Sequence, residues 1–211
     1  MSLPGKKEFC EFCRLVQGRG LVSGSGGNLS LSLEGRILIS PSGRPLGALR
    51  EEDVVELLPD GSALGGRPSS ERRMHEACYA VRPELRAVLH VHSPWATALS
   101  CSLDLDMRRA IPVLTPGYGK RVGELPALPY RLPGSAQLAE EVGAVIARRD
   151  SVLLCNHGVV TVGRSFEEAL VLAEEIEAEA MMFLLLGRNA RQLDPDELAA
   201  LSGYQAAGGG V

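Results

Sequence analysis

The alternation of apolar and polar residues predicts a chain in which helices and strands are interspersed. Residues 29–33 alternate between leucine and serine, which is typical of a strand with one buried face. Residues 87–93 are mostly apolar or β-branched, which predicts a buried strand. In residues 6–17 the apolar side chains recur at helical spacing, which predicts an amphipathic helix. The same patterns predict further helices at 71–81, 94–99, 135–149, 165–186 and 194–201, and further strands at 36–40, 54–58, 110–115, 151–156 and 159–162.

The order of these elements predicts the class of fold. The first two strands, joined at Glu34 and Gly35, form a hairpin, and helices follow between the later strands. This order favours an α/β domain with a largely antiparallel sheet over a doubly wound parallel one. Residues 116–133 are rich in proline and glycine and are predicted to be irregular. The length favours a single domain over residues 1–211, with a flexible tail at about 203–211.

Composition and charge argue against several classes of function. The net charge of −4 comes from 22 basic and 26 acidic residues that are interspersed, so no basic patch for nucleic acid is expected. The longest apolar run, residues 181–186, is too short to span a bilayer. The first residues are polar, which argues against a signal peptide, and five scattered cysteines fit a reducing compartment. We therefore expect a cytoplasmic protein that binds neither nucleic acid nor a membrane.

Three of the four histidines lie in or directly after predicted strands. His90 and His92 are two residues apart, so their side chains project from the same face of a strand. His157 follows another apolar run, residues 151–154. Three imidazoles would hold a metal ion and leave one coordination position open, and a chain of this length does not need a metal for stability, which favours a catalytic site. The alternative is that these are core histidines hydrogen-bonded to backbone carbonyls.

Three short polar segments could together bind a phosphate group. Glycine lets backbone amides approach an anion closely, and hydroxyls with free N–H groups at a helix start also bind phosphate. Each segment alone is also compatible with a turn or a helix cap. The candidate phosphate ligands in these segments are Gly27, Asn28, Ser42, Gly43, Ser69 and Ser70.

Glu71 directly follows the third polar segment and is the carboxylate that we expect to act as general base. A metal ion would polarise a ketone and stabilise an enediolate, while the carboxylate removes the adjacent proton, which is typically worth ~10²–10⁴ in rate. A phosphate clamp would orient the substrate. These parts predict cleavage or formation of a C–C bond on a phosphorylated sugar. His75, one helical turn after Glu71, could be a partner behind the site, but it is expected instead to be a packed or exposed residue.

Five motifs, taken together and in this order, resemble the class II aldolase/adducin family. They are Gly26–Ser30, Ile39–Gly43, Pro68–Glu71, His90–Ser93 and Asn156–Gly158. The resemblance covers about residues 6–190 and implies a three-layer α/β/α fold around a mainly antiparallel sheet. It also implies a homotetramer with active sites at the subunit interfaces. Residues 68–75 most resemble the L-fuculose-1-phosphate aldolase branch of the family.

That branch implies a zinc-dependent aldolase that cleaves a phosphorylated ketose into dihydroxyacetone phosphate and an aldehyde. The implied Zn²⁺ ligands are His90, His92 and His157, although imidazole sites also bind Mn²⁺ or Co²⁺. The resemblance implies Glu71 as the acid/base group and the six residues named above as phosphate ligands. The candidates for the tyrosines that act on the aldehyde are Tyr118 and Tyr204.

Other activities within the family stay open. L-ribulose-5-phosphate 4-epimerases have a similar site but usually carry aspartate at the position of Glu71. Methylthioribulose-1-phosphate dehydratases share the histidines and a glutamate, and decarboxylases of phosphorylated sugar acids are similar again. A non-enzymatic, adducin-like binding module is expected to lack the metal ligands or the base, and this chain retains both.

Overall fold

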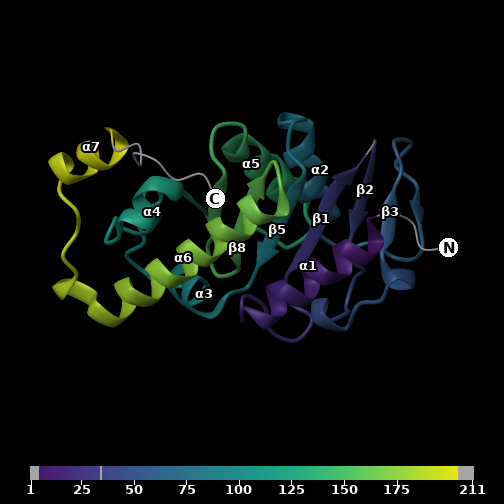
Figure 1. Ribbon diagram of the computed structural model, residues 1–211, viewed down its shortest axis with the longest axis horizontal. Coiled ribbons are helices and arrows are strands. Elements are labelled where there is room, and N and C mark those ends of the chain that lie inside the picture. The colour runs from purple at the N-terminus through teal and green to yellow at the C-terminus, as the bar shows by residue number, and fades with distance from the viewer. Residues whose placement is uncertain (1–4, 34, 204–211) are drawn as a thin grey trace, which may run out of the picture.

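A computed structural model of the chain describes residues 5–33 and 35–203, which form an α/β fold around one eight-stranded sheet (Figure 1). In spatial order the strands are β4 (Ala63–Leu64), β3 (Val55–Leu57), β2 (Arg36–Ile39), β1 (Asn28–Leu33), β5 (Ala87–Val91), β8 (Gly158–Gly163), β7 (Ser151–Leu154) and β6 (Ala127–Leu128). Every neighbouring pair is antiparallel except β6 and β7. The predicted α/β class with a mainly antiparallel sheet is confirmed. The predicted turn residue Glu34 and the tail beyond Gly203 lie outside the described residues.

Helices pack on both faces of the sheet, as Figure 1 shows. One face shares a buried apolar cluster with α1 (Lys6–Gly18), α3 (Pro94–Ser100), α4 (Pro116–Arg121) and α6 (Phe166–Leu186). The other face shares a separate cluster with α2 (Arg72–Val81) and α5 (Ala136–Ile146). The remaining helical segments are α7 (Pro195–Gly203) and the 3₁₀ turns Leu46–Ala48, Glu51–Asp53 and Gly187–Asn189. The sheet is thus the middle one of three layers.

The strict alternation of side chains in β5 and β1 decides which residues meet. Leu89 and Val91 pack into the cluster of α1 and α6, so His90 between them points to the opposite face, toward α2. In β1 the leucines face α1, and Asn28 and Ser30 therefore also face α2. Asn28 lies directly opposite His90 in the antiparallel register of the two strands. A polar strip thus runs across the centre of the sheet beneath α2.

Two predictions for the middle of the chain are wrong. Residues 110–115 were predicted to be a strand but pair with no strand of the sheet. Residues 116–133 were predicted to be irregular but contain α4 and β6. The start of α4 has a physical reason that the sequence displays: Pro116 occupies its first turn, and the Thr115 hydroxyl accepts a hydrogen bond from the Tyr118 amide.

Three backbone donors of residues 110–115 are satisfied from outside the sheet. The Ala110 N–H donates to the Leu125 carbonyl at 2.8 Å. The carboxylate of Glu179, fully buried on α6, accepts from the backbone N–H groups of Leu114 (2.5 Å) and Thr115 (3.1 Å) and from the Thr115 hydroxyl (2.9 Å). One buried side chain on α6 therefore fixes the segment that leads into α4.

We expect Glu179→Ala to lower the free energy of unfolding by about 3 kcal/mol, because three hydrogen bonds to a buried charge are lost and two backbone donors stay unpaired. Urea denaturation followed by circular dichroism measures the change. Glu174→Ala is the matched control, since Glu174 on the same helix makes only a partly exposed ion pair with Arg19 at 3.4 Å. That control should change stability by less than about 1 kcal/mol. Equal effects of the two substitutions would contradict the anchoring role of Glu179.

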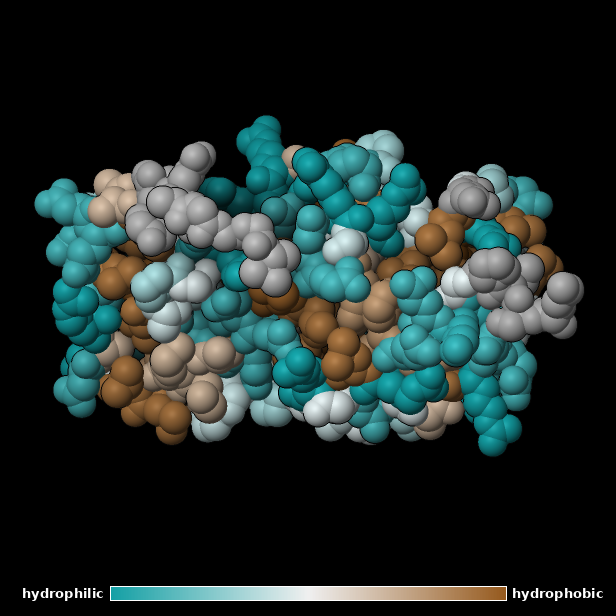
Figure 2. Space-filling model, viewed as in Figure 1, coloured by the Kyte–Doolittle hydropathy of each residue, from teal (hydrophilic) through white to brown (hydrophobic). Residues whose placement is uncertain are grey.

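The last turns of α6 carry apolar side chains on their surface. Met181 is 37% exposed, Leu185 67% and Leu186 48%. Figure 2 shows hydrophobic residues gathered at this end of the molecule, at the lower left of a mainly hydrophilic face. Within the described ranges, none of the helices combines the length and the apolar character that crossing a membrane requires.

Candidate active site

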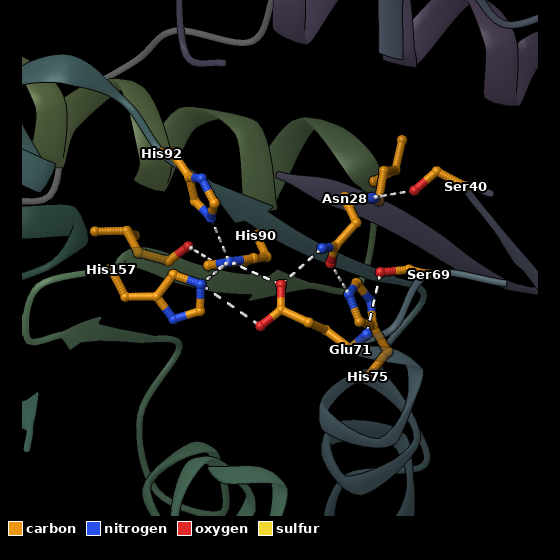
Figure 3. A network of polar contacts seen from close by, with 10 residues as sticks. Asn28, Ser40, Ser69, Glu71, His75, His90, His92 and His157 are labelled. Atoms are coloured by element: carbon orange, nitrogen blue, oxygen red, sulfur yellow. Dashed lines mark hydrogen bonds and ion pairs between the residues drawn. The ribbon is translucent and has the colours of Figure 1, made fainter. Parts of the chain in front are cut away.

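The three histidines predicted to bind metal meet at one end of β5. His90 lies in β5, His92 directly follows it, and His157 lies in the turn between β7 and β8. The antiparallel pairing of β5 with β8 brings that turn beside His90. The Nε2 atom of His90 is 2.9 Å from that of His92 and 3.3 Å from that of His157 (Figure 3). The structure thus brings together all three predicted ligands.

The orientation of His90 fits a metal ligand. Its Nδ1 atom lies 2.9 Å from the Val159 carbonyl, and since a carbonyl only accepts, Nδ1 carries the proton. The Nε2 lone pair then points at the other two imidazoles. Burial lowers the pKa of His92 and that of His157 to about 4, so both rings are neutral, the form that binds metal. The alternative of core histidines bound to carbonyls accounts for one Nδ1 atom but not for three converging Nε2 atoms.

Glu71 is the fourth member of this cluster. Its Oε2 atom is 3.2 Å from His90 Nε2, and its Oε1 atom is 3.6 Å from His157 Nε2. One ligand atom from each of the four residues lies within 4.8 Å of the others. Nitrogen and carboxylate oxygen donors that converge in this way suit a divalent transition-metal ion such as Zn²⁺. The four side chains therefore form a possible metal site.

Contacts around Glu71 fix its charge and leave one of its oxygens free. Burial alone would raise the pKa of Glu71, but the adjacent His90 and the hydrogen bond from the Asn28 amide outweigh burial and lower it, so the carboxyl is ionised. The Asn28 Nδ2 atom donates to Oε2 at 3.0 Å. Oε1 is buried and has no hydrogen-bond partner among the described residues. A buried carboxylate oxygen without a donor is available to take a proton from a ligand.

The polar segments predicted to bind phosphate lie next to one another. The Ser69 N–H donates to the Ser40 carbonyl at 3.0 Å, and the Ser42 N–H donates to the Arg67 carbonyl at 3.1 Å. Residues 40–43 therefore run beside residues 67–70, at the start of α2. The Ser69 hydroxyl accepts from the Glu71 N–H at 3.2 Å, which ties this segment to the carboxylate. Phosphate binding by these residues stays a prediction.

Two glycines beside the histidines allow a close approach of backbones. Gly27 has φ +73°, and a Cβ atom there would come 2.7 Å from the His90 carbonyl oxygen. A Cβ atom on Gly158 would collide with the Val91 carbonyl oxygen. Gly43, in the second polar segment, has φ +76° but open space around it, so conformation alone favours glycine there. The glycines at 27 and 158 thus hold neighbouring strands against the histidine strand.

Three arginines beside these polar segments were not predicted from the sequence. Arg67, Arg72 and Arg73 line a cavity of about 250 Å³ together with Ser69 and Ser70. None of the three forms an ion pair with another described residue, although acidic residues outnumber basic ones in the chain. Three arginines within residues 67–73 could have indicated an anion-binding site. The sequence-based prediction considered only the net negative charge of the whole chain.

The two candidate tyrosines do not join the cluster in the described part of the chain. Tyr118 lies on α4, and its side chain is fully buried in the apolar cluster of α1 and α6. Its hydroxyl has no hydrogen-bond partner there, and burial raises its pKa. Tyr204 lies outside the described residues. A catalytic role for Tyr118 therefore has no contact to support it.

His75 is packed, which is one of the three possibilities considered from the sequence, and it also hydrogen-bonds to Asn28 and Ser30. The ring lies on α2 and is fully buried. Its Nε2 atom contacts the Asn28 side-chain oxygen, and its Nδ1 atom is 2.7 Å from the Ser30 hydroxyl. Burial lowers the pKa of His75 to about 3, so the ring is neutral. Because His75 and Asn28 are 47 positions apart, no local sequence pattern predicts their contact.

Comparison with known proteins agrees with this geometry. The model of the class II aldolase and adducin N-terminal domain matches residues 7–184. The 3-oxo-tetronate 4-phosphate decarboxylase of Escherichia coli K12 is 40% identical over 186 residues, which cover 87% of this chain and 88% of the relative. The L-fuculose phosphate aldolase of Methanocaldococcus jannaschii is 36% identical, with 85% and 96% covered. The crystal structure of YgbL from Escherichia coli superposes with a TM-score of 0.87 at 38% identity, covering 93% and 96% of the two chains.

The family model and the relatives each cover most of the chain. The chain belongs to the class II aldolase/adducin family. The resemblance inferred from five short motifs is therefore confirmed.

Proposed function

We propose that the protein is a metal-dependent lyase that decarboxylates a phosphorylated 3-oxo sugar acid, 3-oxo-tetronate 4-phosphate. The cluster of three histidines and Glu71 supports a metal-dependent lyase. The relatives support the choice of reaction, since the decarboxylase is 40% identical and the aldolase 36%. From the sequence, the aldolase is the first expectation and the decarboxylase is one of the alternatives. We reverse that order.

The proposed substrate carries a carboxylate at C1, a hydroxyl at C2, a ketone at C3 and a phosphate at C4. In the reaction the C1–C2 bond breaks, CO₂ leaves, and the electron pair moves toward the C3 oxygen. One proton must then be added at C2, and the product is dihydroxyacetone phosphate. A divalent metal ion held by His90, His92 and His157 would polarise the ketone and stabilise the charge that develops on its oxygen.

Glu71 is the group that moves the proton. It is ionised, and its Oε1 atom lacks a hydrogen-bond partner, so that oxygen accepts the C2 hydroxyl proton when the substrate binds. After CO₂ has left, Oε1 returns the proton to C2, and the C2 oxygen takes one from solvent. The reaction thus consumes one proton overall. Residues 40–43 and 67–70, with the unpaired arginines beside them, would hold the phosphate and orient C2 toward Glu71.

The choice of decarboxylation over aldol cleavage rests on the number of proton-transfer groups in the site. CO₂ leaves without a proton, so one carboxylate is sufficient for decarboxylation. Aldol cleavage removes the hydroxyl proton at the departing carbon and adds a proton at the neighbouring carbon, which two groups at different positions would serve. Within the described residues the metal cluster contains Glu71 as its one carboxylate, and Tyr118 is buried elsewhere. Cleavage of L-fuculose 1-phosphate remains the second candidate, because it yields the same dihydroxyacetone phosphate.

The test offers both substrates to the same zinc-loaded protein. We expect CO₂ and dihydroxyacetone phosphate from 3-oxo-tetronate 4-phosphate, and little product from L-fuculose 1-phosphate. A chelator should stop the reaction and added Zn²⁺ should restore it, with Mn²⁺ and Co²⁺ as comparisons. Turnover of L-fuculose 1-phosphate alone would replace the decarboxylase by the aldolase. Turnover that survives complete removal of metal would contradict the metal-dependent mechanism.

We also propose that the chain forms the homotetramer that the family resemblance implies. The exposed apolar side chains of Met181, Leu185 and Leu186 at the end of α6 support burial against a neighbouring copy.

A further inference from the structure

A chain of hydrogen bonds leads from the buried interior to the carboxylate of Glu71. Its members are Glu71, Asn28, His75, Ser30 and Tyr79, contributed by β1 and α2. Figure 3 shows the Asn28 side chain between Glu71 on one side and His75 on the other. None of these residues except Glu71 belongs to the metal cluster.

The direction of each hydrogen bond follows from the chemistry of the next group. The ionised carboxylate of Glu71 can only accept, so the Asn28 amide must present its NH₂ group there, at 3.0 Å. The Asn28 side-chain oxygen then faces His75, and because it too can only accept, His75 Nε2 must carry a proton. The reverse orientation of Asn28 would place two acceptors against each other. The carboxylate thus dictates the state of the histidine.

Ser30 and Tyr79, at the interior end of this series of hydrogen bonds, complete the assignment of the His75 protonation state. A neutral ring protonated at Nε2 accepts at Nδ1, and the Ser30 hydroxyl lies there at 2.7 Å as the donor. The Tyr79 hydroxyl donates in turn to the Ser30 carbonyl at 3.0 Å and lies 2.9 Å from the Ser30 hydroxyl. The His75 ring is fully buried and contacts no carboxylate, which opposes a charged ring. The hydrogen bonds from Ser30 to His75, from His75 to Asn28 and from Asn28 to Glu71 then all point toward the carboxylate, while the Tyr79 proton goes to the Ser30 backbone carbonyl.

We propose that His75 is a positioning residue, which fixes the Asn28 amide through Nε2–H and thereby holds Oε2 of Glu71. The inference deepens the proposed function, since it rests on Glu71 as the proton-transfer group. Holding Oε2 leaves Oε1 as the free oxygen that faces the substrate. It also engages the Asn28 oxygen and one amide hydrogen, so one hydrogen remains for a phosphate group.

The first test compares two substitutions of similar size. The amide nitrogen of glutamine reaches the position of His75 Nε2 and can donate to Asn28, whereas leucine has no donor. We expect His75→Leu to lower kcat by about 10- to 100-fold, as loss of a hydrogen-bond partner behind a reactive group typically does. KM for the sugar-acid phosphate and the bound zinc should change little. His75→Gln should recover most of kcat, which a merely structural role for the imidazole would not produce. Equal kcat in both variants and the parent protein would overturn the proposal.

The second test does not depend on turnover. Two-dimensional ¹H–¹⁵N spectra of the zinc-loaded protein, with ¹⁵N-labelled histidine, report which ring nitrogen carries the proton. The His75→Gln spectrum identifies the His75 signals by their absence. We expect a neutral ring protonated at Nε2. A ring protonated at Nδ1, or at both nitrogens, would overturn the assignment. If this state is found but no decarboxylation is detected, the proposed reaction fails while the hydrogen-bond chain stands.

Discussion

Glu71→Gln is expected to keep the bound metal and lose nearly all turnover. Glutamine has the same shape and can still accept from Asn28, but it cannot take a proton from the substrate. Loss of a positioned acid/base group costs about 10²- to 10⁴-fold in kcat. Steady-state kinetics on 3-oxo-tetronate 4-phosphate measure the rate, and elemental analysis of the dialysed protein measures the metal.

Glu76→Gln is the matched control for that experiment. Glu76 lies on α2, the helix that Glu71 immediately precedes, but does not belong to the metal cluster. The control should retain the rate of the parent protein. If Glu71→Gln also retained that rate, Glu71 would not be the proton-transfer group, and the mechanism would need another one.

His92→Ala is expected to remove both metal and turnover. Its Nε2 atom faces that of His90 at 2.9 Å, so alanine removes one of three converging nitrogen donors. The loss of metal affinity should exceed the factor of about 10 to 100 that follows when only the partner behind a ligand is removed. Titration of the metal-free protein with Zn²⁺ in the presence of a competing chelator measures the affinity. Addition of free imidazole, which can occupy the vacated space, should restore part of the metal binding.

Ser93→Ala provides the control for His92→Ala. Ser93 is the next residue, is buried, and has a hydroxyl without a hydrogen-bond partner among the described residues. Its replacement should leave zinc affinity unchanged. Unchanged zinc affinity in His92→Ala would exclude this histidine as a ligand.

The sequence displays those features of the fold and site that depend on local spacing. The leucine and serine alternation of residues 29–33 predicts β1, and the spacing of His90 and His92 predicts that both rings share a face. The distances between the histidine nitrogens agree with that spacing. The pairing with His157 depended on the resemblance and on the run before it, because the antiparallel register of β5 and β8 has no local signal.

What the sequence could not predict depends on contacts between distant segments. Residues 110–115 are apolar enough for a strand, but Glu179 and Leu125 take up their backbone donors. Nothing local distinguishes Glu179 from the other glutamates of α6, because its burial follows from how residues 113–118 dock on that helix. The strands β4 and β6, of two residues each, are too short to show any periodicity.

The glycines at positions 27 and 158 have a consequence for how the metal site comes into being. They let β1 and β8 interlock with the histidine strand on both sides, without room even for a methyl group. An interlocked strand cannot slide past its neighbours, so we expect the backbone that carries the imidazoles to be in place before an ion arrives. The ligand residues therefore lose backbone conformational entropy when the sheet forms. Metal binding then requires less loss of entropy. We therefore expect folding, rather than ion capture, to build the possible metal site.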